Sequence, residues 1–133
     1  MTMLLDSFFL IKSIDERDET NLQGVAVKHY KAELLVEPGH PIFGGHFPEN
    51  PIVPGVCQIQ MILETLSSVT LRKLKLSESD NVKFLSMINP LETPLLTLDL
   101  VVKQPDEDHY YVQASLASGN ITFLKFKGIL SAK

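Results

Sequence analysis

The chain has 133 residues, of which 44% are apolar and 21% charged, and its net charge at pH 7 is −4. This length predicts one domain spanning residues 1–133, and the composition excludes a disordered chain. The acidic balance argues against nucleic acid as the main partner. The lone cysteine, Cys57, excludes an internal disulfide and provides no metal-binding set, so we expect no metal and no cofactor.

The N-terminal segment MTMLLDSFFLIKSIDERDE is the part of the chain that most resembles a targeting sequence. It lacks a basic start, is interrupted by Asp6 and Ser7, and offers no small-residue cleavage site. No apolar run approaches the roughly 20 residues that a membrane span requires. We therefore expect a cytoplasmic protein that does not associate with membranes.

The first third of the chain contains one clear strand. Residues 4–11 are compatible with a short helix or a strand, and the charged residues 14–21 suggest a turn. Residues 25–36 alternate between a wetter face and an apolar face, which predicts a long strand. The expected apolar face comprises Ala26, Tyr30, Ala32, Leu34 and Val36.

A loop rich in glycine and proline then leads into a helix. Gly44 and Gly45 permit backbone angles that a side chain would forbid, and three prolines stiffen the residues that follow. Pro54 and Gly55 stand where a helix begins, and the free N–H groups of its first turn would suit an oxygen that carries negative charge. Apolar residues at helical spacing predict a mostly buried helix that begins at Pro54-Gly55 and fades near Arg72 to Leu76. They are Val56, Ile59, Leu63 and Leu66, widened by Ile62 and Val69.

The remainder of the chain predicts antiparallel strands. After a polar loop at residues 77–81, strands are expected at 82–88, 95–103, 110–117 and 121–130, with a turn at 104–108 and a two-residue hairpin turn at Gly119-Asn120. One helix and such a meander make an α+β domain whose sheet curls round the helix. The open sheet edges make pairing with a second copy plausible.

The stretch HFPENPIVPGV, residues 46–56, resembles the signature of the β-hydroxyacyl-acyl-carrier-protein dehydratases, the FabA/FabZ-like family. All fixed positions of the pattern H-F-P-x-x-P-[IV]-x-P-G-V are present, and weaker likeness extends to residues 7–10 and 82–90. The resemblance implies the hot-dog fold, in which a curled antiparallel sheet wraps one long helix. It also implies a homodimer, or a higher oligomer built from dimers, with active sites shared between subunits.

The resemblance further implies the dehydration of 3-hydroxyacyl thioesters, carried by acyl carrier protein or CoA, to trans-2-enoyl thioesters. That reaction requires a base for the α-proton, an acid for the hydroxyl and donors for the thioester oxygen. His46 is the candidate base, and the Gly55 N–H is the candidate donor to the oxygen. Phe47 and Val56 would border the acyl chain.

One position departs from the family pattern. The family has Glu or Asp fourteen residues after the histidine and often Gln four residues later, whereas this chain has Gln60 and Glu64. An amide cannot exchange a proton at neutral pH, but residues four apart share one helix face. Gln60 is therefore expected to line the site or bind water. Glu64 is a candidate acid, or else a polar residue at a dimer seam or in an ion pair.

Two alternative functions follow from this departure. In the first, the chain is a thioester hydrolase on the same fold. In the second, it is a non-catalytic acyl-binding or heterodimer subunit whose acid lies on a partner chain. The cluster of Arg72, Lys73 and Lys75 either complements the helix dipole or docks an acidic carrier protein. Cys57 is expected in the core. The other histidines, His29, His40 and His109, are expected at the surface or in turns.

Overall fold

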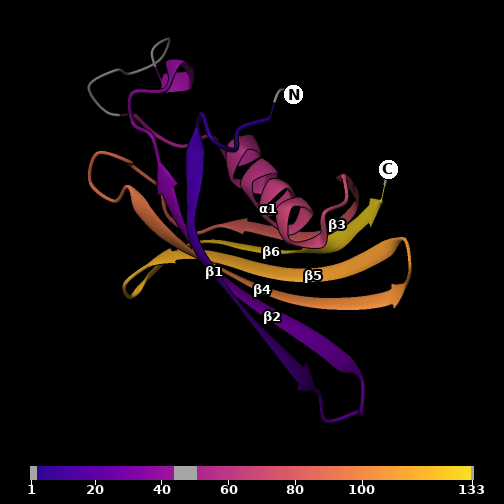
Figure 1. The fold of residues 1–133 in the computed structure, drawn as a ribbon. Coiled ribbons are helices and arrows are strands. Elements are labelled where there is room, and N and C mark those ends of the chain that lie inside the picture. Colours follow the sequence, from indigo (N-terminus) through magenta and orange to yellow (C-terminus); the bar gives the residue numbers. More distant parts are fainter. Residues whose placement is uncertain (1–2, 44–50, 133) are drawn as a thin grey trace.

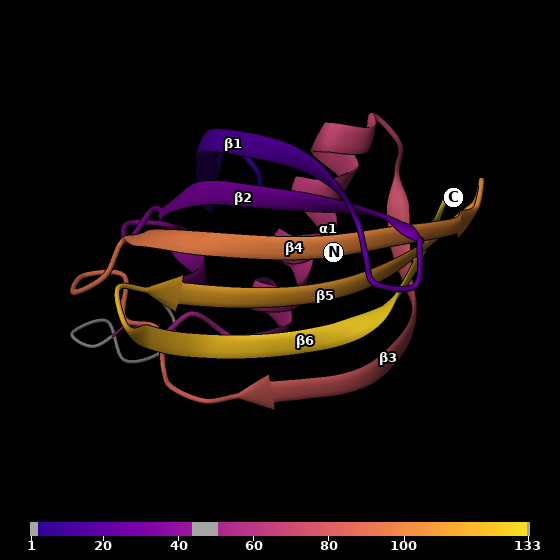
Figure 2. The ribbon, with the colours of Figure 1, turned by 90° about the horizontal axis from the view of Figure 1, so that it is seen from below.

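The computed structural model describes residues 3–43 and 51–132. Its six strands are all paired antiparallel in the order β1-β2-β4-β5-β6-β3. Figure 1 shows α1 lying on one face of the curled sheet, and Figure 2 shows the strand order from the opposite face. The α+β architecture is thereby confirmed. The elements are β1 (Phe9–Thr20), β2 (Ala26–Val36), the 3-10 turn η1 (Pro41–Phe43), α1 (Gly55–Thr70), β3 (Leu74–Phe84), β4 (Leu95–Asp106), β5 (His109–Ser118) and β6 (Ile121–Ala132).

The core lies between α1 and the inner faces of the central strands. Every second residue is buried from Leu96 to Val102 on β4 and from Tyr110 to Leu116 on β5, the alternation of a strand with one buried face. Neighbouring strands bring these residues opposite one another, so that Leu98 pairs with Leu116 and Leu100 with Ala114. On β2 the same alternation holds from Tyr30 to Val36. Ala26, expected on this face, is exposed, and Val27 is buried instead.

Two segments expected to be irregular are parts of the edge strands. Residues 14–21, expected as a turn, continue β1 to Thr20, and residues 77–81, expected as a loop, lie inside β3. Most side chains of both strands are exposed, so neither segment shows the apolar alternation of a half-buried strand. Each is held by its backbone pairing with one neighbour, β2 or β6.

Helix α1 buries only part of the expected stripe: Ile62 and Leu66 are buried as predicted, whereas the other expected members are more exposed. Its buried apolar residues are Cys57, Met61, Ile62 and Leu66, whereas Ile59 and Leu63 are half-buried and Val56 is exposed. The helix ends at Thr70, earlier than the expected range of Arg72 to Leu76, because β3 already begins at Leu74. The Thr70 hydroxyl donates to the Leu66 carbonyl at 2.9 Å. Over the described part of the chain, no helix has the length and hydropathy that a membrane crossing requires.

Candidate functional site

The two motif residues at the centre of the prediction, His46 and Phe47, lie outside the described residues. The second part of the motif, from Pro51 onwards, packs against the core. Pro51 and Val53 are buried, and the Val53 N–H donates to the Ile88 carbonyl at 2.9 Å. The buried Gln58 amide donates to the Val53 carbonyl at 3.3 Å. These contacts fix the start of α1 against the core.

The first turn of α1 has backbone donors that the helix itself leaves unpaired. Pro54 precedes the helix in an extended conformation, with φ −62° and ψ 148°, and no side chain of the described residues caps the helix start. The Pro54 carbonyl accepts from the N–H groups of Cys57 and Gln58 at 3.0 and 3.1 Å. The N–H groups of Gly55 and Val56 come before these in the helix and have no intrahelical acceptor. Such donors suit an oxygen that gains negative charge during a reaction.

Glycine at residue 55 is explained by the aromatic ring above it. A Cβ on Gly55 would lie 2.7 Å from Cζ of Phe84, closer than real Cβ contacts. The Phe84 side chain is half exposed, and it packs against the start of the helix from the end of β3. Neither the periodicity of the helix nor the proline pattern pointed to Phe84, because the contact joins segments far apart in the chain.

Gln60 and Glu64 form a hydrogen-bonded pair one turn apart on α1. Gln60 Nε2 donates to Glu64 Oε2 at 2.7 Å. The Glu64 carboxylate also accepts from the Leu4 N–H at 2.9 Å to each oxygen and from the Leu5 N–H at 2.6 Å to Oε1. Glu64 is buried, and none of the described residues forms an ion pair with it. The prediction that the interchanged residues lie together on one helix face therefore agrees with the geometry.

A hollow of about 500 Å³ lies beside this pair. Met3, Leu5, Gln60 and Glu64 line one part of it, and Arg72 and Lys73 are among the residues that line the rest. Arg72 itself is held by the turn between β4 and β5, because it donates to Asp108 Oδ1 at 3.0 Å and to the Tyr110 hydroxyl at 3.1 Å. The hollow therefore combines an amide, a carboxylate and cationic groups at the surface of α1.

The remaining candidate residues have structural partners. Cys57 is buried in the core, as expected, and burial raises the pKa of its thiol. His29 pairs with Glu19 at 2.7 Å and His109 with Asp106 at 2.8 Å. His40 accepts from the Ile42 N–H through Nδ1 at 3.1 Å. Among residues 3–43 and 51–132, no group of three His, Cys, Asp or Glu side chains has the spacing of a metal site.

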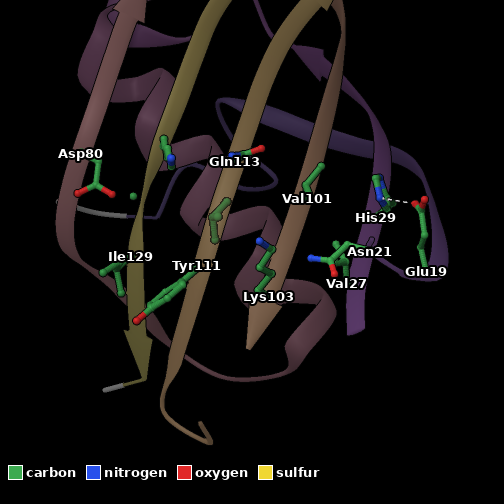
Figure 3. A pocket seen from close by; sticks show the side chains of 13 residues that line it. Glu19, Asn21, Val27, His29, Asp80, Val101, Lys103, Tyr111, Gln113 and Ile129 are labelled. Carbon is green, nitrogen blue, oxygen red and sulfur yellow. Dashed lines mark ion pairs between the residues drawn. The ribbon is translucent and has the colours of Figure 1, made fainter. Parts of the chain in front are cut away.

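A second hollow, of about 560 Å³, lies on the sheet face away from α1 (Figure 3). Figure 3 shows Tyr111, Lys103 and Val101 on neighbouring strands, with the His29–Glu19 pair at one end. None of its lining residues belongs to the motif or to α1. The candidate site is therefore the region around the first turns of α1.

Comparisons with known proteins show the family to which the chain belongs. The family model described as ApeI-like, ApeI dehydratase, matches residues 22–128. A 3-hydroxyacyl-[acyl-carrier-protein] dehydratase FabZ from Ehrlichia chaffeensis is 32% identical over 87 residues, which cover 59% of this chain and 61% of the relative. The matched part of the chain thus spans about three fifths of the length of that curated relative.

Solved structures share the fold. The dehydratase heterocomplex ApeI:P from Xenorhabdus doucetiae is similar with a TM-score of 0.56 and 23% identity, over 90% of this chain and 98% of that one. A putative thioesterase, yhdA, from Lactococcus lactis is similar with a TM-score of 0.63 and 6% identity, over 92% of both chains. The hot-dog fold is thereby confirmed. Since the family model covers most of the sequence, this chain belongs to the ApeI-like dehydratase family.

Proposed function

We propose that this chain dehydrates 3-hydroxyacyl thioesters to trans-2-enoyl thioesters. The observation that supports this most directly is the start of α1 within the motif, where the N–H groups of Gly55 and Val56 have no acceptor in the helix. The thioester oxygen would accept from the Gly55 N–H as negative charge develops on it. His46 would take the α-proton, the Cα–Cβ double bond would form, and the hydroxyl would leave as water after it gains a proton. Phe47 and Val56 would border the acyl chain.

A second candidate function, a subunit that requires a partner chain, is favoured by the Gln60–Glu64 pair. Residue 60 is an amide, and all four hydrogen bonds of the Glu64 carboxylate in the described part of the chain come from N–H donors. Under this candidate the proton for the leaving hydroxyl comes from a carboxyl group of a homologous partner. The solved heterocomplex ApeI:P is named as a dehydratase made of two different components.

A turnover assay separates these functions from thioester hydrolysis. The protein is incubated with 3-hydroxyacyl and 2-enoyl thioesters of both acyl carrier protein and CoA, alone and together with a homologue encoded beside it. We expect interconversion of the hydroxyacyl and enoyl thioesters with the thioester bond intact. Turnover only in the mixture supports the partner-dependent form, and release of free thiol without enoyl product contradicts the proposal.

The edge of β3 supports a dimer next to the same site. The other edge strand, β1, carries charged residues along most of its length, which discourages pairing. At the end of β3, by contrast, Phe84, Leu85 and Met87 are exposed apolar residues. Phe84 also contacts Gly55, so a chain that pairs with β3 would lie close to the helix start. We therefore propose that β3 is the dimer edge.

The dimer is expected to be lost in Phe84→Lys, because a charge placed on this edge would be buried against the partner. Sedimentation at micromolar concentration is expected to give twice the mass of one chain for the parent and a single-chain mass for the variant. Leu22→Lys is the matched control, since Leu22 is fully exposed in the turn between β1 and β2. A parent protein that sediments as a stable monomer would contradict this proposal.

A further inference from the structure

We propose that Glu64 is a positioning residue that fastens the N-terminal turn to α1 and sets the direction of the Gln60 amide. The contacts are direct. Both carboxylate oxygens accept from the Leu4 N–H at 2.9 Å, Oε1 accepts from the Leu5 N–H at 2.6 Å, and Oε2 accepts from Gln60 Nε2 at 2.7 Å. A carboxylate satisfies all of these donors, because it only accepts hydrogen bonds. The carboxylate is thus engaged on both oxygens within the chain.

The N-terminal turn has the geometry that a carboxylate stabilises. The Leu4 carbonyl accepts from the Phe8 N–H at 2.7 Å, which closes one helical turn. The N–H groups at the start of such a turn have no partner within it. These N–H groups donate their hydrogen bonds to the Glu64 carboxylate. Leu4 and Phe8 are buried, so water is a poor substitute partner for the Leu4 N–H. Figure 1 shows the N-terminal trace running beside α1.

The same turn reaches the chain that leads into the motif. The Phe8 ring lies 5.3 Å from the ring of Phe43 and 5.3 Å from that of His40, between centroids. The Phe8 carbonyl accepts from the Glu37 N–H at 2.8 Å. Phe43 stands three residues before His46 in the sequence. The turn at residues 4–8 therefore connects the Gln60–Glu64 pair on α1 with the segment that precedes the motif histidine.

Glu64 also determines which atom Gln60 offers to the site. Because the carboxylate only accepts, the amide nitrogen of Gln60 must face it, and the amide oxygen is directed away. Gln60 then has its oxygen available to accept from a hydroxyl or a water molecule. In the proposed reaction that oxygen would hold the substrate hydroxyl without protonating it, and only this step of the inference depends on the proposed function.

Nuclear magnetic resonance of the full chain tests the contacts without any turnover. In Glu64→Ala, we expect the Leu4 and Leu5 amide protons to exchange at least about tenfold faster, as when a hydrogen bond to a charged group is lost. The side-chain amide resonance of Gln60 is expected to shift. In Glu64→Gln one oxygen remains for Leu4 and Leu5, so their protection is expected to persist while the Gln60 resonance still shifts. Glu92→Gln is the matched control, since Glu92 is an exposed carboxylate in the loop before β4.

Two results would overturn the inference. One is a Glu64→Ala protein in which the exchange rates of the Leu4 and Leu5 amide protons and the side-chain amide resonance of Gln60 are the same as in the parent. The other is a Glu64→Gln protein that loses its turnover while both signals stay as in the parent, which would make Glu64 a proton donor. If the parent has no dehydratase activity at all, the proposed function fails, and the exchange and resonance measurements still decide the role of Glu64.

Discussion

Exchanging the two residues of the pair, by Gln60→Glu together with Glu64→Gln, is expected to raise dehydration by the chain alone at least about 100-fold. That factor is the usual scale for a general acid placed at the reacting group. In the exchanged pair, the new amide at residue 64 would accept from the Leu4 and Leu5 N–H groups through its oxygen. Its nitrogen would donate to the new carboxylate at residue 60. The double variant therefore retains the contacts of residue 64 with the N-terminal turn. It also retains the hydrogen bond between residues 60 and 64, but residue 64 is now the donor. A carboxyl group then occupies the position where the family has its acid.

Gln60→Glu alone is expected to raise the rate of dehydration far less than the double variant does. The present Gln60 nitrogen lies 2.7 Å from Glu64 Oε2, so the single change would place two carboxyl groups against each other in a half-buried position. They would have to share a proton, which would then be directed at Glu64 and away from the substrate. The two substitutions are therefore expected to be strongly non-additive, as for residues in one hydrogen-bonded network.

Initial rates of enoyl thioester formation for the parent, both single variants and the double variant measure this coupling. Thermal unfolding of the same four proteins shows whether a low rate reflects a damaged fold. A double variant that is folded yet no faster than Gln60→Glu would contradict the expectation that a carboxyl group at residue 60 protonates the leaving hydroxyl.

The sequence predicted those parts of the fold in which burial of one face produces a regular spacing of apolar residues. The strands expected at 95–103 and 110–117 lie within β4 and β5, and α1 starts at Pro54-Gly55 as predicted. The edge strands β1 and β3 were missed in part because both of their faces are largely exposed. Backbone pairing holds such strands, and pairing leaves no hydrophobic pattern to detect.

The buried face of α1 was ambiguous for the opposite reason. Apolar residues surround much of the helix, so hydropathy alone does not choose between a stripe that contains Val56 and one that contains Cys57 and Met61. Val56 is exposed in the single chain, close to the proposed dimer edge at Phe84. An exposed apolar residue at that place is consistent with a surface that a partner covers.

The site was predictable only where the residues lie in one motif. The spacing of Gln60 and Glu64 was sufficient to place them on one helix face. Their partners, Leu4 and Leu5, are about 60 residues away and contribute backbone N–H groups, which every residue type except proline provides. No residue pattern marks such a contact, and the role of the N-terminal turn therefore became visible only in the folded chain.

His46→Ala is expected to reduce dehydration by at least about 100-fold while the chain remains folded. The proposed reaction begins with removal of the α-proton, and a general base at that step contributes typically about 10² to 10⁴ in rate. Alanine has no group to accept the proton, whereas the described contacts that fix the start of α1 come from Val53, Gln58 and Ile88. Binding of the enoyl thioester is therefore expected to persist when the rate is lost.

The other histidines provide matched controls for that experiment. His29 and His109 are held by Glu19 and Asp106 on strands away from the helix start, so His29→Ala and His109→Ala are expected to keep the parent rate. Added imidazole is expected to restore part of the activity of His46→Ala, because it supplies the missing base in solution. The rate is followed by the conversion of 3-hydroxyacyl to 2-enoyl thioester under saturating substrate. If His46→Ala keeps more than half of the parent rate, the α-proton goes to another group, and the assignment of the base must change.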